Sequence, residues 1–216
     1  MNIVLSSIFS FLEEWAAWEW ILFALCIAAV VGCILWLVLS PKKEKKPVQL
    51  RTLIYGAMCV ALSFVLSYIK LWQMPMGGSV TLVSMLPLMV YANRFGLKNG
   101  LIAGLAYGLL QFIQKPEIYQ WAQIIIDYPL AFMLVGLAGA VKNLQLGCLI
   151  GGFARFLCHF ATGVIFFGEY APEGMNVYLY SLGYNGGYMG VDTLLCIVLS
   201  IPLMLALNRY LPKRAE

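Results

Sequence analysis

Charged residues are scarce in this sequence. Asp, Glu, Lys and Arg together make up 11% of its 216 residues, whereas they make up about a quarter of an ordinary soluble domain. Hydrophobic residues make up 62%, and the mean hydropathy is +0.85. This composition excludes a soluble globular protein and predicts an all-α integral membrane protein.

The sequence also lacks the motifs that hold nucleotides and metals. It has no phosphate-binding loop, no GxGxxG after a strand and no HExxH. Six cysteines lie within apolar runs, and no two of them have CxxC spacing. Neither a disulfide framework nor a metal site is therefore predicted, and we interpret the cysteines as buried apolar side chains.

Seven apolar segments reach, or nearly reach, the roughly 20 helical residues that cross a hydrocarbon core. They are 18–40, 51–71, 81–95, 98–114, 120–141, 145–168 and 184–210. A charged, proline-bounded stretch, SPKKEKKPVQ, separates the first segment from the others. We therefore predict four parts: an extra N-terminal transmembrane anchor at 1–40, a basic cytoplasmic linker at 41–50, a six-helix unit at 51–210 and a cytoplasmic tail at 211–216.

The basic residues lie between the hydrophobic runs, as topology determinants do, and do not indicate nucleic-acid binding. One side of the scheme carries Lys42, Lys43, Lys45, Lys46, Arg51, Arg94, Lys98, Lys142, Arg209, Lys213 and Arg214, and the other carries Glu13, Glu14, Glu19, Glu117, Glu169 and Glu173. The positive-inside rule makes the basic side cytoplasmic. The N-terminus is then outside, the C-terminus inside, and the loops 72–80, 115–119 and 169–183 outside.

Four ionisable residues lie well inside predicted spans, away from their ends: Asp127, Arg155, His159 and Asp192. Such residues are costly in a membrane and mark candidate functional sites. A helical rise of 1.5 Å per residue places Asp127 and His159 at about the same depth, roughly 12–13 Å from the outer ends of their helices. Arg155 lies one turn deeper on the face that carries His159.

Other polar residues share faces with these groups. Gln123 lies one turn before Asp127, and Asn185, Tyr188 and Asp192 share a face of the last helix. Together these residues predict a polar chamber in the outer half of the membrane.

Aromatic residues surround the expected mouth of this chamber: Trp72, Tyr119, Trp121, Tyr128, Phe166, Phe167, Tyr170, Tyr178, Tyr180 and Tyr184. A carboxylate among ring faces and amides favours a flat, cationic, hydrogen-bonding ligand, although Arg155 leaves an anionic one open. Each group could instead have a structural role. The aromatic residues could form a belt at the membrane interface. Arg155 could form an ion pair with Asp127 or Asp192 that only fixes helix packing, and His159 could be a buried imidazole with satisfied hydrogen bonds.

Four stretches carry a resemblance to a known family. They are MPMGGSVTLVSMLPL (74–88), QIIIDYPLAF (123–132), RFLCHFATGVIFFGEYAPEG (155–174) and YLYSLGYNGGYM (178–189). Their order and spacing resemble the bacterial thiamine transporter family, whose members are the thiamine-specific S-components of energy-coupling factor (ECF) transporters. The resemblance covers residues 50–210.

The resemblance implies a six-helix S-component bundle in the bacterial cell membrane, with a high-affinity thiamine pocket near its outer surface. It implies no cofactor and no enzymatic activity. It also implies three partners: a transmembrane coupling protein and two ATP-binding-cassette subunits that hydrolyse ATP.

The resemblance also assigns residues. The substrate-binding acidic residue of the family falls on Asp127, and the residue after it on Tyr128. The pocket histidine falls on His159, with the basic residue one turn earlier at Arg155. Further pocket positions fall on Gly163, Tyr180 and Asn185. The chain departs from the family pattern at three places. Some members have Trp at the position of Phe167, and some have Glu at the position of Asp127. Some members have a lid Trp in the segment that reads MPMGGSV here, and Trp72 could take its place. Asp192 has no counterpart. On the first helix of the unit, the small pair Ala57 and Ala61 allows close helix approach, either for internal packing or for docking on the coupling protein, as in the family.

Three alternatives remain. A stand-alone secondary transporter would use Asp127, His159 and Asp192 as a proton relay. An S-component could instead bind another vitamin or a thiamine precursor. A membrane enzyme acting on lipids would need an acidic metal cluster or a nucleophile–base pair, and the sequence shows neither.

Overall fold

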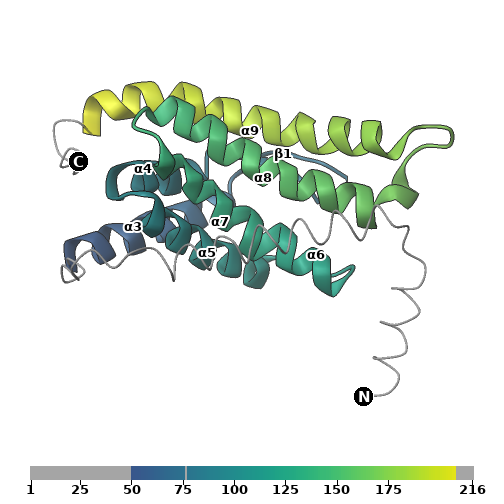
Figure 1. The fold of residues 1–216 in the computed structure, drawn as a ribbon, viewed down its shortest axis with the longest axis horizontal. Helices are drawn as coiled ribbons and strands as arrows, with labels where there is room; N and C mark the ends of the chain where they lie inside the picture. The colour runs from purple at the N-terminus through teal and green to yellow at the C-terminus, as the bar shows by residue number, and fades with distance from the viewer. Residues whose placement is uncertain (1–49, 76, 208–216) are drawn as a thin grey trace, which may run out of the picture. The chain divides into compact units, whose positions relative to one another are not determined.

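A computed structural model describes residues 50–75 and 77–207, all of which belong to one compact unit of the chain. The predicted anchor at 1–40, nearly all of the linker at 41–50 and the tail at 211–216 lie outside the described residues. Within these limits the chain is mostly helical (Figure 1).

The elements follow one another in a simple order. They are α3 (Leu50–Ser67), β1 (Lys70–Gln73), β2 (Ser79–Thr81), α4 (Leu86–Phe95), α5 (Leu97–Gln114), α6 (Trp121–Ile125), the π-helical turn η1 (Ile126–Leu130), α7 (Ala131–Val135), the 3₁₀ helix η2 (Gly136–Ala140), α8 (Leu144–Phe166), the 3₁₀ turn η3 (Gly168–Tyr170) and α9 (Val177–Leu207). Among them, α3, the run from α6 to η2, α8 and α9 are long and apolar enough to cross a membrane. The all-α membrane class is thus confirmed, and the expected helix count is confirmed in part.

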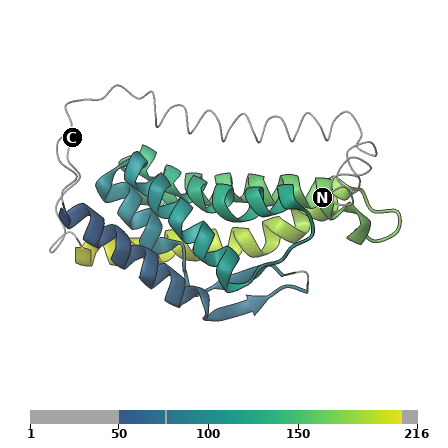
Figure 2. The ribbon, with the colours of Figure 1, turned by 90° about the horizontal axis from the view of Figure 1, so that it is seen from below.

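The helices form a bundle around α4. The long helices α8 and α9 lie side by side (Figures 1 and 2). Both α4 and the α6–η2 run pack against α8, and α5 packs against the other side of that run. Almost every residue of α4 from Leu86 to Arg94 is buried, as expected for a helix enclosed by others. The outer face of α3, by contrast, exposes Leu53, Met58 and Leu62, which suits a surface in contact with lipid or with another membrane protein.

Three glycines of α5 bring its backbone against neighbouring helices. A Cβ on Gly104 would overlap the backbone of Phe132 in α7, and a Cβ on Gly108 would overlap the backbone of Tyr128 in η1. A Cβ on Gly100 would overlap Ala92 of α4. Small residues at a spacing of four allow such close approach between membrane helices.

The helix predicted at 120–141 is present as a continuous run, but its geometry changes along its length. Pro129 lies inside the run, and proline lacks the N–H that an α-helix needs and crowds the carbonyl four residues earlier. The widened π turn η1 therefore spans Ile126–Leu130. Such turns often occur at functional sites, and this one carries Asp127.

Two expected boundaries are wrong because a β-hairpin replaces helix ends. Residues 70–73 pair antiparallel with residues 79–81, with an irregularity between Lys70 and Trp72, so the first helix ends at Ser67 and α4 begins only at Leu86. Gly77 turns the chain with φ +98°, a conformation that favours glycine. A third boundary is also wrong, since α9 begins at Val177 and not near residue 184.

We predict that Gly104→Ala destabilises the bundle, because the added methyl group meets the α7 backbone and not a movable side chain. Overpacking of this kind costs about 1–3 kcal/mol. Thermal unfolding in detergent, followed by circular dichroism, should show a lower midpoint for this variant. Gly190→Ala is the matched control, because a Cβ there meets nothing within 4 Å; an equal fall in both variants would contradict the packing argument.

Candidate functional site

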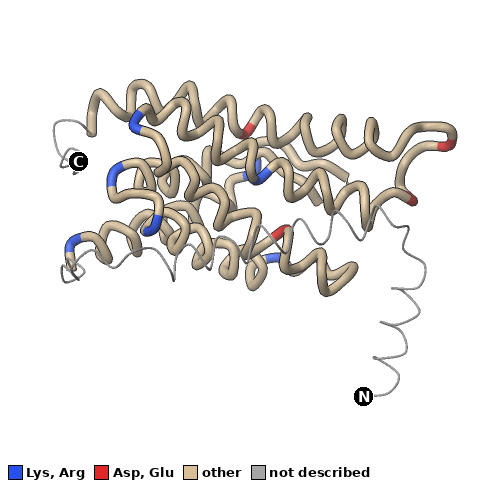
Figure 3. Tube along the Cα trace, in the orientation of Figure 1, with Lys and Arg blue, Asp and Glu red and all other residues tan. Residues whose placement is uncertain are grey.

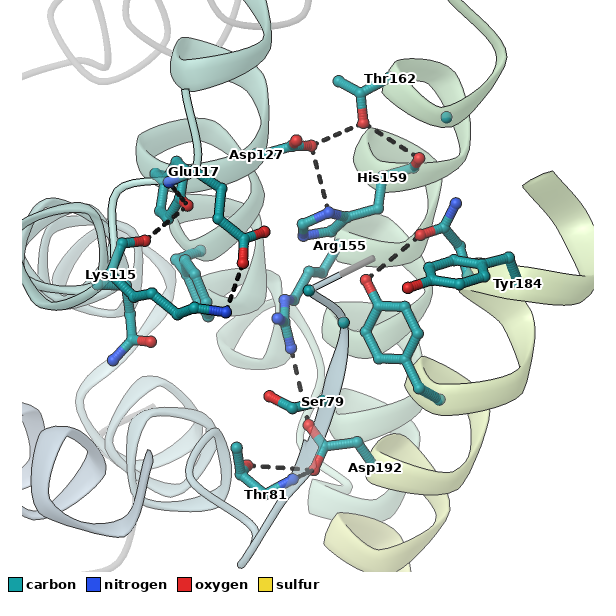
Figure 4. A pocket seen from close by; sticks show the side chains of 18 of the residues that line it. Ser79, Thr81, Lys115, Glu117, Asp127, Arg155, His159, Thr162, Tyr184 and Asp192 are labelled. Carbon is teal, nitrogen blue, oxygen red and sulfur yellow. Dashed lines mark hydrogen bonds and ion pairs between the residues drawn. The ribbon is translucent and has the colours of Figure 1, made fainter. Parts of the chain in front are cut away.

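A cavity of about 170 Å³ lies within the described part of the bundle. It has space for several waters or a small organic molecule. Side chains from the hairpin, α5, the α6–η1 run, α8 and α9 converge on it (Figure 4). All nine residues predicted to bind substrate line it: Gln123, Asp127, Tyr128, Arg155, His159, Gly163, Phe167, Tyr180 and Asn185.

Asp127 is the centre of a buried hydrogen-bond network. Its Oδ2 accepts from the Gln123 amide at 2.8 Å, and its Oδ1 accepts from the Thr162 hydroxyl at 2.7 Å. The residue is only 7% exposed. Two uncharged donors therefore fix both carboxylate oxygens, which a buried carboxylate requires.

His159 contacts the same carboxylate. Its Nδ1 lies 3.2 Å from Oδ1 of Asp127, so the two groups that helical rise places at one depth touch each other. With Nδ1 donating to the carboxylate, Nε2 is the remaining polar atom of the ring. Nε2 is buried and has no hydrogen-bond partner among the described residues.

Arg155 pairs with Asp192 and not with Asp127. Its Nη1 lies 3.7 Å from Oδ2 of Asp192 and 3.1 Å from the sulfur of Met85. The guanidinium carbon lies 4.4 Å from the centre of the Phe132 ring, a favourable cation–π distance. The sequence left open whether Arg155 pairs with Asp127 or with Asp192, and the structure shows the pair with Asp192.

Asp192 also holds the β-hairpin. Its Oδ1 lies 3.3 Å from both the backbone nitrogen and the hydroxyl of Thr81 in β2. The Thr81 hydroxyl is in turn 2.7 Å from the hydroxyl of Ser84. Asp192 lines the cavity, as the face that it shares with Asn185 and Tyr188 predicted. Its contact with the hairpin was not predicted, and through it Asp192 joins α9 to the hairpin and to α8 (Figure 4).

The α9 wall is held by a polar ladder. Ser181 donates to the carbonyl of Phe160 at 2.9 Å, Asn185 donates to Ser181 at 3.2 Å, and Tyr188 donates to Oδ1 of Asn185 at 3.3 Å. Gly163 faces this ladder, and a Cβ there would overlap Ser181. Glycine at this position thus lets α8 and α9 approach closely beside the cavity.

Tyr128 fixes the loop that follows α5. Its hydroxyl donates to the carbonyl of Lys115 and accepts from the backbone nitrogen of Glu117, each at 2.9 Å. The side chains of Lys115 and Glu117 pair at 2.6 Å. Gly77 of the hairpin turn faces Glu117, whose carboxylate would overlap a Cβ there, so the loop and the turn meet beside the cavity.

Only some of the aromatic residues expected at the mouth line the cavity. Those that do are Tyr128, Phe167, Tyr170, Tyr180 and Tyr184. Phe167 packs edge-on against Tyr119 at 4.8 Å, and Tyr184 lies between Tyr180 and Tyr188 at about 6 Å from each ring. Trp72 and Trp121 do not line it and are 54% and 44% exposed.

Several lining residues escaped the sequence analysis. Thr162 lies three residues after His159, and this spacing alone places it on the same helical face. Ser67, Gln111 and Gln114 form a second polar group at another part of the cavity. Their signal was weak, because uncharged polar residues near helix ends are common.

The arrangement is suited to binding a small ligand. It offers a carboxylate, that of Asp127, which makes no ion pair with a Lys or Arg, together with an imidazole, amide groups and ring faces. Among residues 50–75 and 77–207, no three His, Cys, Asp or Glu side chains cluster as metal ligands would.

Comparisons with known proteins agree with one another. The sequence profile of a family described as "Thiamine transporter protein (Thia_YuaJ)" matches residues 53–211. The chain is 31% identical over 188 residues to "Thiamine transporter ThiT" of Bacillus subtilis (strain 168), covering 76% of this chain and 95% of the relative. It is 34% identical over 175 residues to the protein of the same name from Lacticaseibacillus paracasei, covering 69% and 85%.

A solved structure is also similar. This structure of ThiT from Listeria monocytogenes shares 31% sequence identity, with a TM-score of 0.68. The alignment covers 77% of this chain and 100% of that one.

We predict that Tyr128→Phe loosens the loop at 115–119 without unfolding the bundle. The variant loses two hydrogen bonds, each worth about 0.5–1.5 kcal/mol. Hydrogen–deuterium exchange should become faster in this loop and stay unchanged in α4. Tyr55→Phe is the control, because it removes a hydroxyl at a ring that stacks on Phe95, outside the cavity. Unchanged exchange at 115–119 in the Tyr128 variant would contradict the assigned role.

Proposed function

The chain belongs to the thiamine transporter protein family, and from this premise we propose that it is the thiamine-binding membrane subunit of an ATP-driven ECF importer. It is a multi-pass membrane protein and a transporter, not an enzyme.

The buried Asp127 carboxylate carries the proposal. It is contacted by an amide, a hydroxyl and an imidazole, while the nearest guanidinium, that of Arg155, is engaged by Asp192. A buried carboxylate that makes no ion pair with a Lys or Arg of the protein favours a cationic ligand. Thiamine carries a permanent positive charge on its thiazolium ring, so it supplies what this cavity lacks.

The remaining groups match the other parts of thiamine. The aminopyrimidine is flat and has hydrogen-bond donors and acceptors, which the unpartnered Nε2 of His159 and the amide of Asn185 can meet. The rings of Phe167, Tyr180 and Tyr184 offer faces for stacking and for the cation. Tyr128, Gly163, Gln123 and Arg155 then shape and support the pocket.

The charge distribution supports an outward-facing cavity. The described Lys and Arg residues that do not line the cavity gather at the end of the bundle where α9 ends, and the α8–α9 loop at the other end carries Glu169 and Glu173 (Figure 3). By the positive-inside rule the basic end is cytoplasmic. The cavity residues Phe167 and Tyr170 lie next to the acidic loop, so the ligand enters from outside.

The exposed small residues of α3 support coupling to a partner. Ala57 and Ala61 are exposed on one face of α3, and this exposure supports the docking interpretation over internal packing. Small residues on an exposed face let another membrane helix approach closely. The coupling protein would dock there, and its two ATPase subunits would supply the energy.

A stand-alone, proton-coupled transporter is the second candidate. The 3.2 Å contact between His159 and Asp127 favours it, since such pairs can pass protons. Asp192, the third member of the imagined relay, is bound by Arg155 and Thr81. This makes a continuous relay less favourable than a binding pocket.

We predict that the purified protein binds thiamine saturably in detergent, and that Asp127→Asn weakens this binding. The loss should be about 1.5–3 kcal/mol, the value of a hydrogen bond to a charged group. Isothermal titration calorimetry measures both affinities, with riboflavin as an unrelated vitamin. Glu173→Gln makes the same chemical change in an exposed loop outside the cavity and should bind as the wild type does. Wild-type affinity in a folded Asp127→Asn variant would remove Asp127 from the site.

We predict that Ala57→Leu combined with Ala61→Leu abolishes thiamine uptake in cells and leaves thiamine binding intact. Bulky side chains would block the approach of the coupling helix. Ala106→Leu adds the same bulk at an exposed alanine of α5 and should transport normally. Normal uptake by the double variant, together with sensitivity to a protonophore and indifference to loss of the ATPases, would favour the stand-alone transporter.

A further inference from the structure

We propose that Asp192 determines the charge preference of the cavity, because it holds the Arg155 guanidinium away from Asp127 and so keeps Asp127 available for a cationic ligand. This inference rests on the proposed function and deepens it. Asp192 is a positioning residue in this view, since it acts through Arg155 and Thr81.

Three contacts hold the Arg155 guanidinium against the cavity wall. They are the ion pair to Asp192, the contact with the Met85 sulfur and the face of the Phe132 ring. The side chain is only 12% exposed, so water screens its charge poorly. The guanidinium of Arg155 therefore contributes a strong positive charge wherever it points.

Arg155 lies between two carboxylates. It is one helical turn from His159, which touches Asp127, and its own guanidinium points toward Asp192 (Figure 4). A free guanidinium at this place would have Asp127 as its next acceptor. Asp192 removes that possibility by engaging Nη1 itself.

The position of Asp192 is in turn fixed. Its Oδ1 lies 3.3 Å from the Thr81 nitrogen and hydroxyl, while its Oδ2 faces Arg155. Because the residue is 1% exposed, both oxygens depend on these partners. The hairpin thus helps aim the carboxylate that restrains Arg155.

The charge balance follows from these contacts. In the buried part of the cavity Asp192 neutralises Arg155, and Asp127 keeps one negative charge for the ligand. The other charged lining residues, Lys70, Lys115 and Glu117, lie at the more exposed rim, where Lys115 pairs with Glu117. Solvent screens that rim more strongly than the interior.

The test compares one cationic ligand with its phosphorylated form. Thiamine and thiamine monophosphate are each titrated calorimetrically against the wild type and Asp192→Asn. The variant keeps the shape of the side chain and removes its charge, so the guanidinium becomes free to pair with Asp127. The ratio of thiamine affinity to monophosphate affinity should fall on the order of tenfold, the effect of one poorly screened charge.

Two further variants separate charge from structure. Thr81→Val removes the hydroxyl contact and keeps every charge, so it should change both affinities by similar factors. The double variant Arg155→Gln with Asp192→Asn replaces the ion pair by two neutral amides and leaves Asp127 unopposed. It should regain the wild-type ratio, whereas a purely structural role would make it no better than Asp192→Asn.

The outcomes are distinguishable. A wild-type protein that does not bind thiamine contradicts the proposed function itself. A wild-type protein that binds thiamine, with an unchanged ratio in Asp192→Asn or an equal fall in Thr81→Val, overturns the role of Asp192. Should Asp192→Asn fail to fold, the double variant decides, since a collapsed ratio there contradicts the proposal.

Discussion

The constraint on which the structure depends is the cost of placing charge inside an apolar bundle. Three charged residues line a cavity enclosed by helices that are long and apolar enough to cross a membrane: Asp127, Arg155 and Asp192. Each of them needs partners within the protein, because lipid provides none. Asp127 is contacted by the Gln123 amide, the Thr162 hydroxyl and the His159 imidazole. Arg155 and Asp192 form an ion pair with each other. The hairpin, the π turn and the α8–α9 pair are positioned around these contacts.

Fold and site meet where α5 packs against η1. Gly108 lies so close to the Tyr128 backbone that no side chain fits between them. Tyr128 in turn ties the loop at 115–117, and its neighbour Asp127 lies at the centre of the cavity network. The π turn that Pro129 introduces is thus fixed by the packing of α5 at Gly108 and by the hydrogen bonds of Tyr128 to the loop at 115–117. A site built on such a rigid element keeps its geometry with less ordering on ligand binding.

Much of this arrangement could be predicted from the sequence, because membrane helices obey few and strong rules. Rise per residue placed Asp127 level with His159, and helical periodicity placed Arg155 beside it. The hairpin could not be predicted, since its strands are only four and three residues long and KLWQ continues an apolar run. The choice of Asp192 over Asp127 as the partner of Arg155 depends on how α8 and α9 pack, which no local pattern encodes. The early start of α9 has the same origin: Tyr178 and Tyr180 suit a loop or a helix equally well.

The path from α3 to the hairpin has a mechanical consequence. Tyr68 and Ile69 continue the hydrogen bonding of the last α3 turn, and the Leu82 nitrogen then bonds to the Ile69 carbonyl at 2.9 Å. No slack segment separates the helix from the strands. Ala57 stands about 15 Å along the helix axis from Ser67, so the exposed small residues of α3 and the cavity wall belong to one continuously hydrogen-bonded segment. A shift of α3 would therefore be passed on to the hairpin beside the cavity.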